Sequence, residues 1–143
     1  MQENYRQTGT DIFTEEPVVY GSFMQRAGAT IIDSIILGIP VLLLIQFTYK
    51  QEIYIISAIV IDWLYYALQE SGSMQATLGK KALGLKVTSL DGQRISFGQA
   101  TGRYFGKIIS RLIIYIGYLM VLWDDKRQGL HDKMAGTLVV KNR

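Results

Sequence analysis

Two long apolar runs constrain the fold of this chain more than any other feature. The first spans residues 24–47, and its stretch from Ala27 to Phe47 carries Asp33 as its only charge. The second spans residues 53–68, with Asp62 as its only charge. As helices, the charge-poor stretches measure about 30 Å and about 24 Å, which suits the hydrocarbon core of a bilayer. Neither shows the polar face that a surface helix needs, so the sequence predicts two transmembrane helices.

A third apolar run, residues 105–123, is less regular. Lys107 and Arg111 interrupt it, and the uncharged part that follows is only twelve residues long. A run of that length is more typical of a re-entrant, interfacial or buried helix than of a complete span. The sequence therefore predicts a short third membrane segment, either re-entrant with a bend at Gly117 or, as the alternative, a full span.

The distribution of Lys and Arg predicts the orientation. The short loop at 48–52 holds one Lys, whereas residues 69–107 hold six Lys and Arg and the tail after Trp123 holds five. By the positive-inside rule the long segment and the N-terminus are cytoplasmic. The basic tail also belongs in the cytoplasm, which favours the re-entrant segment over a third full span. Gln69 and Glu70 are expected at the headgroups beside the second helix.

Local patterns between and after these runs predict a small cytoplasmic cap. Residues 74–83 have a helical pattern and are expected at the membrane interface. Alternating side chains before Asp91-Gly92 predict a β-hairpin over about residues 85–97. Ser96 and Gln99 have capping-box spacing, so a helix is expected to begin there. A turn closed by Gly136 precedes a short strand at 137–141, which is expected to add to the hairpin.

The length and composition bound the remaining possibilities. The chain has 143 residues, a net charge of +3, one His and no Cys. It therefore has no disulfide, no cysteine zinc site and no cysteine nucleophile. We interpret residues 1–17 as a flexible polar tail and residues 18–141 as one membrane domain. The basic balance suits anionic lipid, and the sequence offers no nucleic-acid-binding module.

The two isolated membrane carboxylates are candidates for ion binding or proton coupling. Such groups are costly to insert, usually face protein or water, and often mark function. Asp33 and Asp62 each lie seven residues from the predicted cytoplasmic end of a helix, so we expect them at similar depth. Two neighbouring carboxylates in low dielectric would share a proton or hold a cation between them. Arg26 shares the helix face of Asp33 but lies about 10 Å away along the axis, too far for an unstrained salt bridge.

A basic stripe offers the alternative explanation. Arg103, Lys107 and Arg111 recur at every fourth residue and would lie on one helix face. They are expected to contact anionic lipid headgroups, worth about 1 kcal/mol per residue, or to form ion pairs. On the second interpretation Asp33 is a structural partner of Arg103 or Arg111 rather than a functional carboxylate.

The C-terminal region supplies weaker candidates. His131 and Asp132 are adjacent acid–base groups, but nothing nearby supplies an activated nucleophile, so we expect no enzyme. Asp124 and Asp125 precede Lys126 and Arg127, and with Asp132 they match no metal-loop spacing. The sequence therefore predicts neither a metal site nor a cofactor, and Asp124, His131 and Asp132 remain candidates for a structural or functional motif.

Three segments of the sequence resemble the RDD family of small prokaryotic membrane proteins, named for one Arg and two Asp. They are Arg26-Ala-Gly-Ala-Thr-Ile-Ile-Asp33, the stretch Thr77-Leu-Gly-Lys-Lys-Ala-Leu-Gly-Leu-Lys-Val87, and Gln128-Gly-Leu-His-Asp-Lys-Met-Ala-Gly-Thr-Leu-Val-Val140. The resemblance covers about residues 20–141. Each segment alone is modest evidence, but three in the same order are specific.

The resemblance implies roles for particular residues. It places the family's arginine on Arg26, its first aspartate on Asp33 and its second on Asp132, with Asp124 and Asp125 close by. Gln75 stands where the family often has Gly, a departure that concerns a turn. The resemblance also implies a multi-pass protein of a bacterial or archaeal plasma membrane. The family has no settled general function, although transport has been proposed and cation/proton exchange reported for some members.

Two functional hypotheses follow. The first is a proton-coupled transporter of a monovalent cation or small solute, which would need a homo-oligomer or a partner because so few helices cannot enclose a pathway. The second is a membrane accessory protein that scaffolds or regulates another membrane protein. A small membrane domain with a sizeable cap suits the second hypothesis, and two lone membrane carboxylates suit the first.

Overall fold

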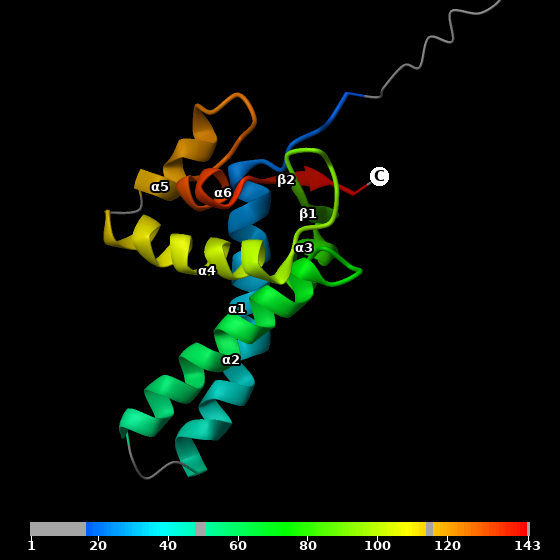
Figure 1. Ribbon diagram of the computed structural model, residues 1–143. Helices are drawn as coiled ribbons and strands as arrows, with labels where there is room; N and C mark the ends of the chain where they lie inside the picture. The colour runs from blue at the N-terminus through cyan, green and yellow to red at the C-terminus, as the bar shows by residue number, and fades with distance from the viewer. Residues whose placement is uncertain (1–16, 48–50, 114–115, 143) are drawn as a thin grey trace, which may run out of the picture.

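The computed structural model describes residues 17–47, 51–113 and 116–142, and within them it is mostly helical with one small sheet (Figure 1). The predicted polar tail lies outside the described residues except for Pro17. The elements, in chain order, are α1 (Phe23–Phe47), α2 (Gln51–Ser71), α3 (Leu78–Ala82), β1 (Leu85–Ser89), α4 (Phe97–Leu112), α5 (Ile116–Leu119), the 3-10 turn η1 (Met120–Leu122), α6 (Leu130–Ala135) and β2 (Thr137–Lys141).

The two long helices have the length and composition of membrane spans, as predicted. α1 and α2 lie next to each other and extend away from the rest of the chain (Figure 1). Few of their side chains are buried within the chain. Ile31, Ile35 and Ile39 of α1 are each more than half exposed, which is the arrangement expected of a surface that faces lipid or another protein. We call the described residues after α2, 72–113 and 116–142, the cap.

The third apolar run forms two helices rather than one. α4 and the α5–η1 pair meet at 115°, a geometry that fits either a broken span or a re-entrant loop. The break lies between Leu112 and Ile116 and not at Gly117, so the predicted position of the bend is wrong. Gly117 is buried within α5, and a Cβ there would come 2.7 Å from the Ser110 hydroxyl, so glycine allows this close packing. The predicted start of α4 is confirmed by a complete capping box between Ser96 and Gln99.

The predicted β-hairpin over residues 85–97 is wrong, although its turn forms. Gly92 has a φ of +76°, and the Ser89 amide donates to the Gln93 carbonyl at 2.8 Å. Only Arg94 and Ile95 lie between Gln93 and Ser96, the N-cap residue of α4, and Ile95 is buried in the core, so no return strand fits. Only two strands are found among the described residues.

β1 instead pairs with β2, the predicted C-terminal strand, which is confirmed. The pairing is antiparallel and joins Leu85 to Lys141 and Ser89 to Thr137. A bridge between Tyr20 and Val140 brings the segment before α1 to the other edge of β2. The sheet therefore brings together three segments that are distant in the sequence: the residues before α1, β1 and β2.

The hydrophobic core lies where the end of α2 meets the sheet and α4. It contains Ala67, Leu85, Val87, Ile95, Ala100 and Val139. The helix predicted over 74–83 is shorter than expected, since α3 begins after Thr77, whose side chain accepts from the Lys80 amide. The core fixes α4 across the end of α2 and so places polar residues of α2, α4 and α6 together (Figure 1).

Candidate functional site

A buried cluster of ionised side chains joins the spans to the cap. We call it the ion cluster; its members are Arg26 of α1, Glu70 of α2, Lys80 of α3, Arg103 and Lys107 of α4, and Asp132 of α6.

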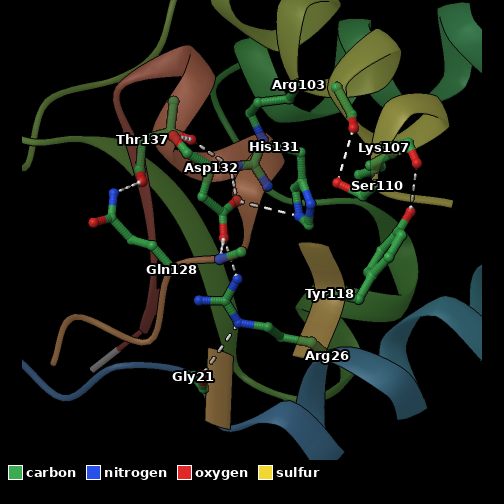
Figure 2. A network of polar contacts seen from close by, with 12 residues as sticks. Gly21, Arg26, Arg103, Lys107, Ser110, Tyr118, Gln128, His131, Asp132 and Thr137 are labelled. Carbon is green, nitrogen blue, oxygen red and sulfur yellow. Dashed lines mark hydrogen bonds and ion pairs between the residues drawn. The ribbon is translucent and has the colours of Figure 1, made fainter. Parts of the chain in front are cut away.

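Arg103 lies at its centre and is 1% exposed. Its Nη1 donates to Asp132 Oδ1 and to the Thr137 hydroxyl (Figure 2). Its Nε donates to Glu70 Oε2 at 2.9 Å. One side chain thus connects α2, α6 and β2.

Asp132 is the second centre of the cluster and is fully buried. Its Oδ2 accepts from Arg26 Nη1 at 2.5 Å and from the Gly129 amide at 3.0 Å (Figure 2). The neighbouring Arg103 and Arg26 guanidinium groups and the Gly129 amide hold the pKa of Asp132 well below its ordinary value despite its burial. The carboxylate is therefore ionised and bonded at both oxygens.

Arg26 is held on both sides of this contact. Its Nε donates to the Gly21 carbonyl at 3.2 Å, and its Nη2 donates to the Arg127 carbonyl at 2.5 Å. With Asp132 as the third partner, the guanidinium connects the first turn of α1 to the segment around α6, more than 100 residues later. Arg26 was a candidate for ion binding. In the structure its guanidinium group bonds to Gly21, Asp132 and Arg127 of the same chain.

Glu70 collects the remaining cations. Lys80 Nζ lies 2.7 Å and Lys107 Nζ lies 3.7 Å from Glu70 Oε1, while Arg103 bonds the other oxygen. Lys107 Nζ also lies 4.0 Å from the centre of the Tyr66 ring, a favourable cation–π distance. Glu70 is 1% exposed, so the chain itself covers this carboxylate.

The cluster carries more positive than negative charge. Four cations, at Arg26, Lys80, Arg103 and Lys107, face the two carboxylates of Glu70 and Asp132. His131 Nε2 lies 3.5 Å from Asp132 Oδ1, but burial lowers the pKa of His131 to about 3, so the imidazole is neutral. The formal charge of these six groups is therefore +2.

Asp33 forms a separate buried site between α1, α2 and α3. Its carboxylate accepts from the Tyr65 hydroxyl at 2.7 Å, the Thr77 hydroxyl at 2.6 Å and the Gly79 amide at 2.7 Å. A Cβ at Gly79 would come 2.8 Å from Asp33 Oδ1, so only glycine allows this approach. Asp33 therefore fastens the start of α3 to α1, and the predicted pairing of Asp33 with Arg103 or Arg111 is wrong.

Asp62 has different surroundings. It is half-buried and interacts electrostatically with Tyr104 and Arg111 of α4. No contact between Asp62 and Asp33 is found among the described residues. The structure thus gives the two carboxylates different partners, with Asp33 facing the start of α3 and Asp62 facing α4.

The remaining residues predicted from the sequence have contacts of their own, some within the ion cluster and some outside it. Of the basic stripe, Arg103 and Lys107 form ion pairs, whereas Arg111 is exposed and contacts Tyr118. Asp124 accepts from the Lys126 and Gln128 amides at 3.1 and 2.9 Å and pairs with Lys133, which stabilises a local turn. The described residues contain no group of three His, Asp or Glu side chains placed to hold a metal ion.

Sequence reasoning missed Glu70, Lys80, Tyr65 and Thr77 as members of these sites. Glu70 ends the second apolar run, where flanking polar residues are ordinary, and its partners lie 10 and 33 residues further along the chain. One available signal was the excess of Lys and Arg in residues 69–107, because several buried cations need a carboxylate.

Comparison with known proteins places the chain among membrane proteins. It is 52% identical over 82 residues to the uncharacterized protein YxaI of Bacillus subtilis, covering 57% of this chain and 54% of the relative. It is 33% identical over 96 residues to the uncharacterized membrane protein YteJ of the same organism, covering 63% of this chain and 54% of the relative.

A third relative is longer. The proline-rich antigen homolog of Mycobacterium tuberculosis is 40% identical over 70 residues, covering 48% of this chain and 29% of the relative. The matches thus span about half or less of the length of these relatives. No solved structure matches the chain significantly.

The family assignment agrees with the geometry. The family model for RDD matches residues 20–136, most of the chain. Arg26 and Asp132, to which the resemblance assigned the arginine and the second aspartate, form a direct ion pair, and Asp33 anchors α3. The chain belongs to the RDD family.

Proposed function

We propose that this RDD protein is a membrane accessory protein, one that scaffolds or regulates another membrane protein and catalyses no reaction itself. The observation that carries the proposal is the state of Asp33. Its carboxylate accepts three hydrogen bonds from neutral donors of the chain and is 1% exposed. A carboxylate that is buried and bonded in this way holds the cap on the spans and is covered by the chain rather than open to a transport pathway.

The surfaces of the spans support the same proposal. The polar groups near the cap are used within the chain, whereas the side chains of α1 that point outward far from the cap are large and apolar, including Leu42 and Leu43. Such a surface can pack against another membrane protein by van der Waals contact, with no ionised group to oppose the contact. A homo-oligomer would use the same surface, so the partner is either a second copy or a different membrane protein.

Proton-coupled transport of a monovalent cation or small solute is the second candidate. Asp62 favours it, because this carboxylate is half-buried in a span and lies near Tyr104 and Arg111 rather than within a closed set of ion pairs. Two spans cannot surround a pathway, so transport would require an assembly of several chains.

A proteoliposome assay separates the two functions. We expect vesicles containing the wild-type protein to keep an imposed pH gradient when Na⁺, K⁺ or Li⁺ is added, because Asp33 is buried and hydrogen-bonded within the chain. Asp33→Asn and Asp62→Asn, which remove one charge with little change of shape, should behave in the same way. We further expect a complex with another membrane protein to survive mild detergent extraction from the native membrane.

The vesicle assay and the purification can each contradict the accessory role. Cation-dependent dissipation that is lost in Asp62→Asn and retained in a folded Asp33→Asn protein would refute the accessory role and establish an exchanger at Asp62. Repeated purification of the tagged protein with no partner would also count against the accessory role.

We also propose that the cap is cytoplasmic and that α4, α5 and η1 do not cross the membrane. Because β1 pairs with β2, residues 85–89 and 137–141 lie on the same side, which supports an intervening segment that returns to the side where it began. The many Lys and Arg of the cap favour the cytoplasmic side of a prokaryotic plasma membrane. The N-terminus is then cytoplasmic as well.

Cysteine labelling tests this orientation directly, since the chain has no natural Cys. Single substitutions Ser73→Cys, Ser89→Cys and Asn142→Cys should each react with an impermeant thiol reagent in inside-out vesicles and not in intact cells. Labelling of position 142 alone from outside would contradict the strand pairing, and external labelling of all three would reverse the orientation.

A further inference from the structure

A pocket of about 490 Å³ lies beside the ion cluster. Its walls come from the first turns of α1, the second half of α4, and α5; they include Phe23, Ala27, Ile31, Lys107, Arg111 and Tyr118. The volume is within the range of about 300–1,000 Å³ found for small-molecule sites. The wall from α1 is largely apolar, and the wall from α4 is basic.

The charges around the pocket have one sign. Five Lys and Arg line it, and the described lining residues include no Asp or Glu. The two carboxylates of the ion cluster leave two positive charges uncompensated, and Lys107 Nζ lies 3.7 Å from Glu70, beyond hydrogen-bond distance. His131 also lines the pocket, and its buried Nδ1 has no hydrogen-bond partner among the described residues. The pocket therefore suits an anion.

The apolar wall continues onto the membrane-facing surface of α1. Ile31 lines the pocket and is 62% exposed, and Ile35 and Ile39 follow it at intervals of four residues, on the same helix face. A ligand with an anionic end in the pocket can extend a hydrocarbon chain along this face without leaving the bilayer. A soluble anion would leave the apolar wall uncovered.

We propose that this pocket binds an anionic phospholipid, with the headgroup phosphate at Lys107 and Arg111 and an acyl chain along Ile31 and Ile35. Phosphate oxygens accept charge-assisted hydrogen bonds from ammonium and guanidinium groups. The lipid comes from the leaflet on the side of the cap. This site goes beyond the accessory role proposed above and does not depend on it.

Electron paramagnetic resonance of spin-labelled lipid tests the site in the intact membrane protein. The full chain is reconstituted into phosphatidylcholine vesicles containing trace spin-labelled phosphatidylglycerol or spin-labelled phosphatidylcholine. The motionally restricted fraction gives the relative association constant of the two lipids. We expect phosphatidylglycerol to be preferred, and Arg111→Gln to reduce that preference roughly fivefold, as removal of one basic residue near the headgroup predicts.

Two further variants distinguish a pocket from general attraction of anionic lipid. Arg94→Gln removes an exposed cation of the cap that does not line the pocket, and it should leave the preference unchanged. Ala27→Leu narrows the pocket without changing the charge, and it should reduce the preference. Folding of each variant is checked by circular dichroism.

Three results would overturn the proposal. The first is equal restriction of the two lipids by the wild-type protein. The second is a preference that folded Ala27→Leu retains in full. The third is displacement of the labelled phosphatidylglycerol by soluble glycerol phosphate, which would show that the phosphate group alone is bound.

Discussion

Asp132→Asn should lower the free energy of unfolding by about 3–5 kcal/mol, the cost of breaking a buried ion pair by removing one partner. The substitution keeps the shape of the side chain but leaves Arg103 buried with one carboxylate fewer, and it removes the only described carboxylate partner of Arg26. A loss of this size is a large fraction of the stability of a small domain. Unfolding by SDS in mixed detergent micelles measures it.

Asp124→Asn is the matched control. Asp124 also pairs with a cation, Lys133, but that lysine is 43% exposed and the pair is accessible to water. We expect this control to cost less than about 1 kcal/mol, as exposed pairs usually do. Equal losses in the two variants would mean that burial of the ion cluster contributes nothing to the stability of the protein.

The contribution of His131 should lower the free energy of unfolding by about 2 kcal/mol when the pH is lowered from 7 to 5. Burial lowers the pKa of His131 from 6.5 to about 3 in the folded protein. Between these values the unfolded chain binds a proton that the folded chain does not, so acid favours unfolding. The carboxylates Asp124 and Asp132, whose pKa values are also lowered, lose their contribution only at still lower pH.

His131→Gln tests the assignment of this pH dependence. The variant lacks the titrating group, so its unfolding free energy should be nearly constant between pH 7 and 5, whatever its absolute value. The measurement is a series of unfolding curves at half-unit pH steps. A wild-type protein with no change over this range would show that His131 is accessible to protons in the folded state.

The spans were predictable from the sequence because their signal is local. An apolar run of helix length needs no partner to be recognised, and the expected segments 24–47 and 53–68 lie within α1 and α2. The start of α4 at Ser96 and the closing turn at Gly136 were predictable for the same reason, since both caps depend on a few adjacent residues.

The pairing of distant residues was not predictable in this way. The turn at Asp91-Gly92 formed, and the strand at 137–141 was expected to join the hairpin; that it pairs directly with β1, with no return strand after the turn, depends on tertiary packing. Asp33 was recognised as an unusual buried carboxylate, yet its neutral partners Tyr65, Thr77 and Gly79 have no distinctive spacing from it. Such contacts depend on tertiary packing. The sequence shows which residues need partners but not which partners they have.

The ion pair between Arg26 at the start of the first span and Asp132 in the cap holds these two parts of the protein together. A double-mutant cycle of Arg26→Gln and Asp132→Asn, measured by unfolding in mixed micelles, tests it most directly. We predict that the double variant loses less stability than the sum of the single losses, by more than about 1 kcal/mol, as expected for residues in direct contact. Additivity within about 0.5 kcal/mol would show that the two side chains do not interact in the folded protein and would contradict the claim.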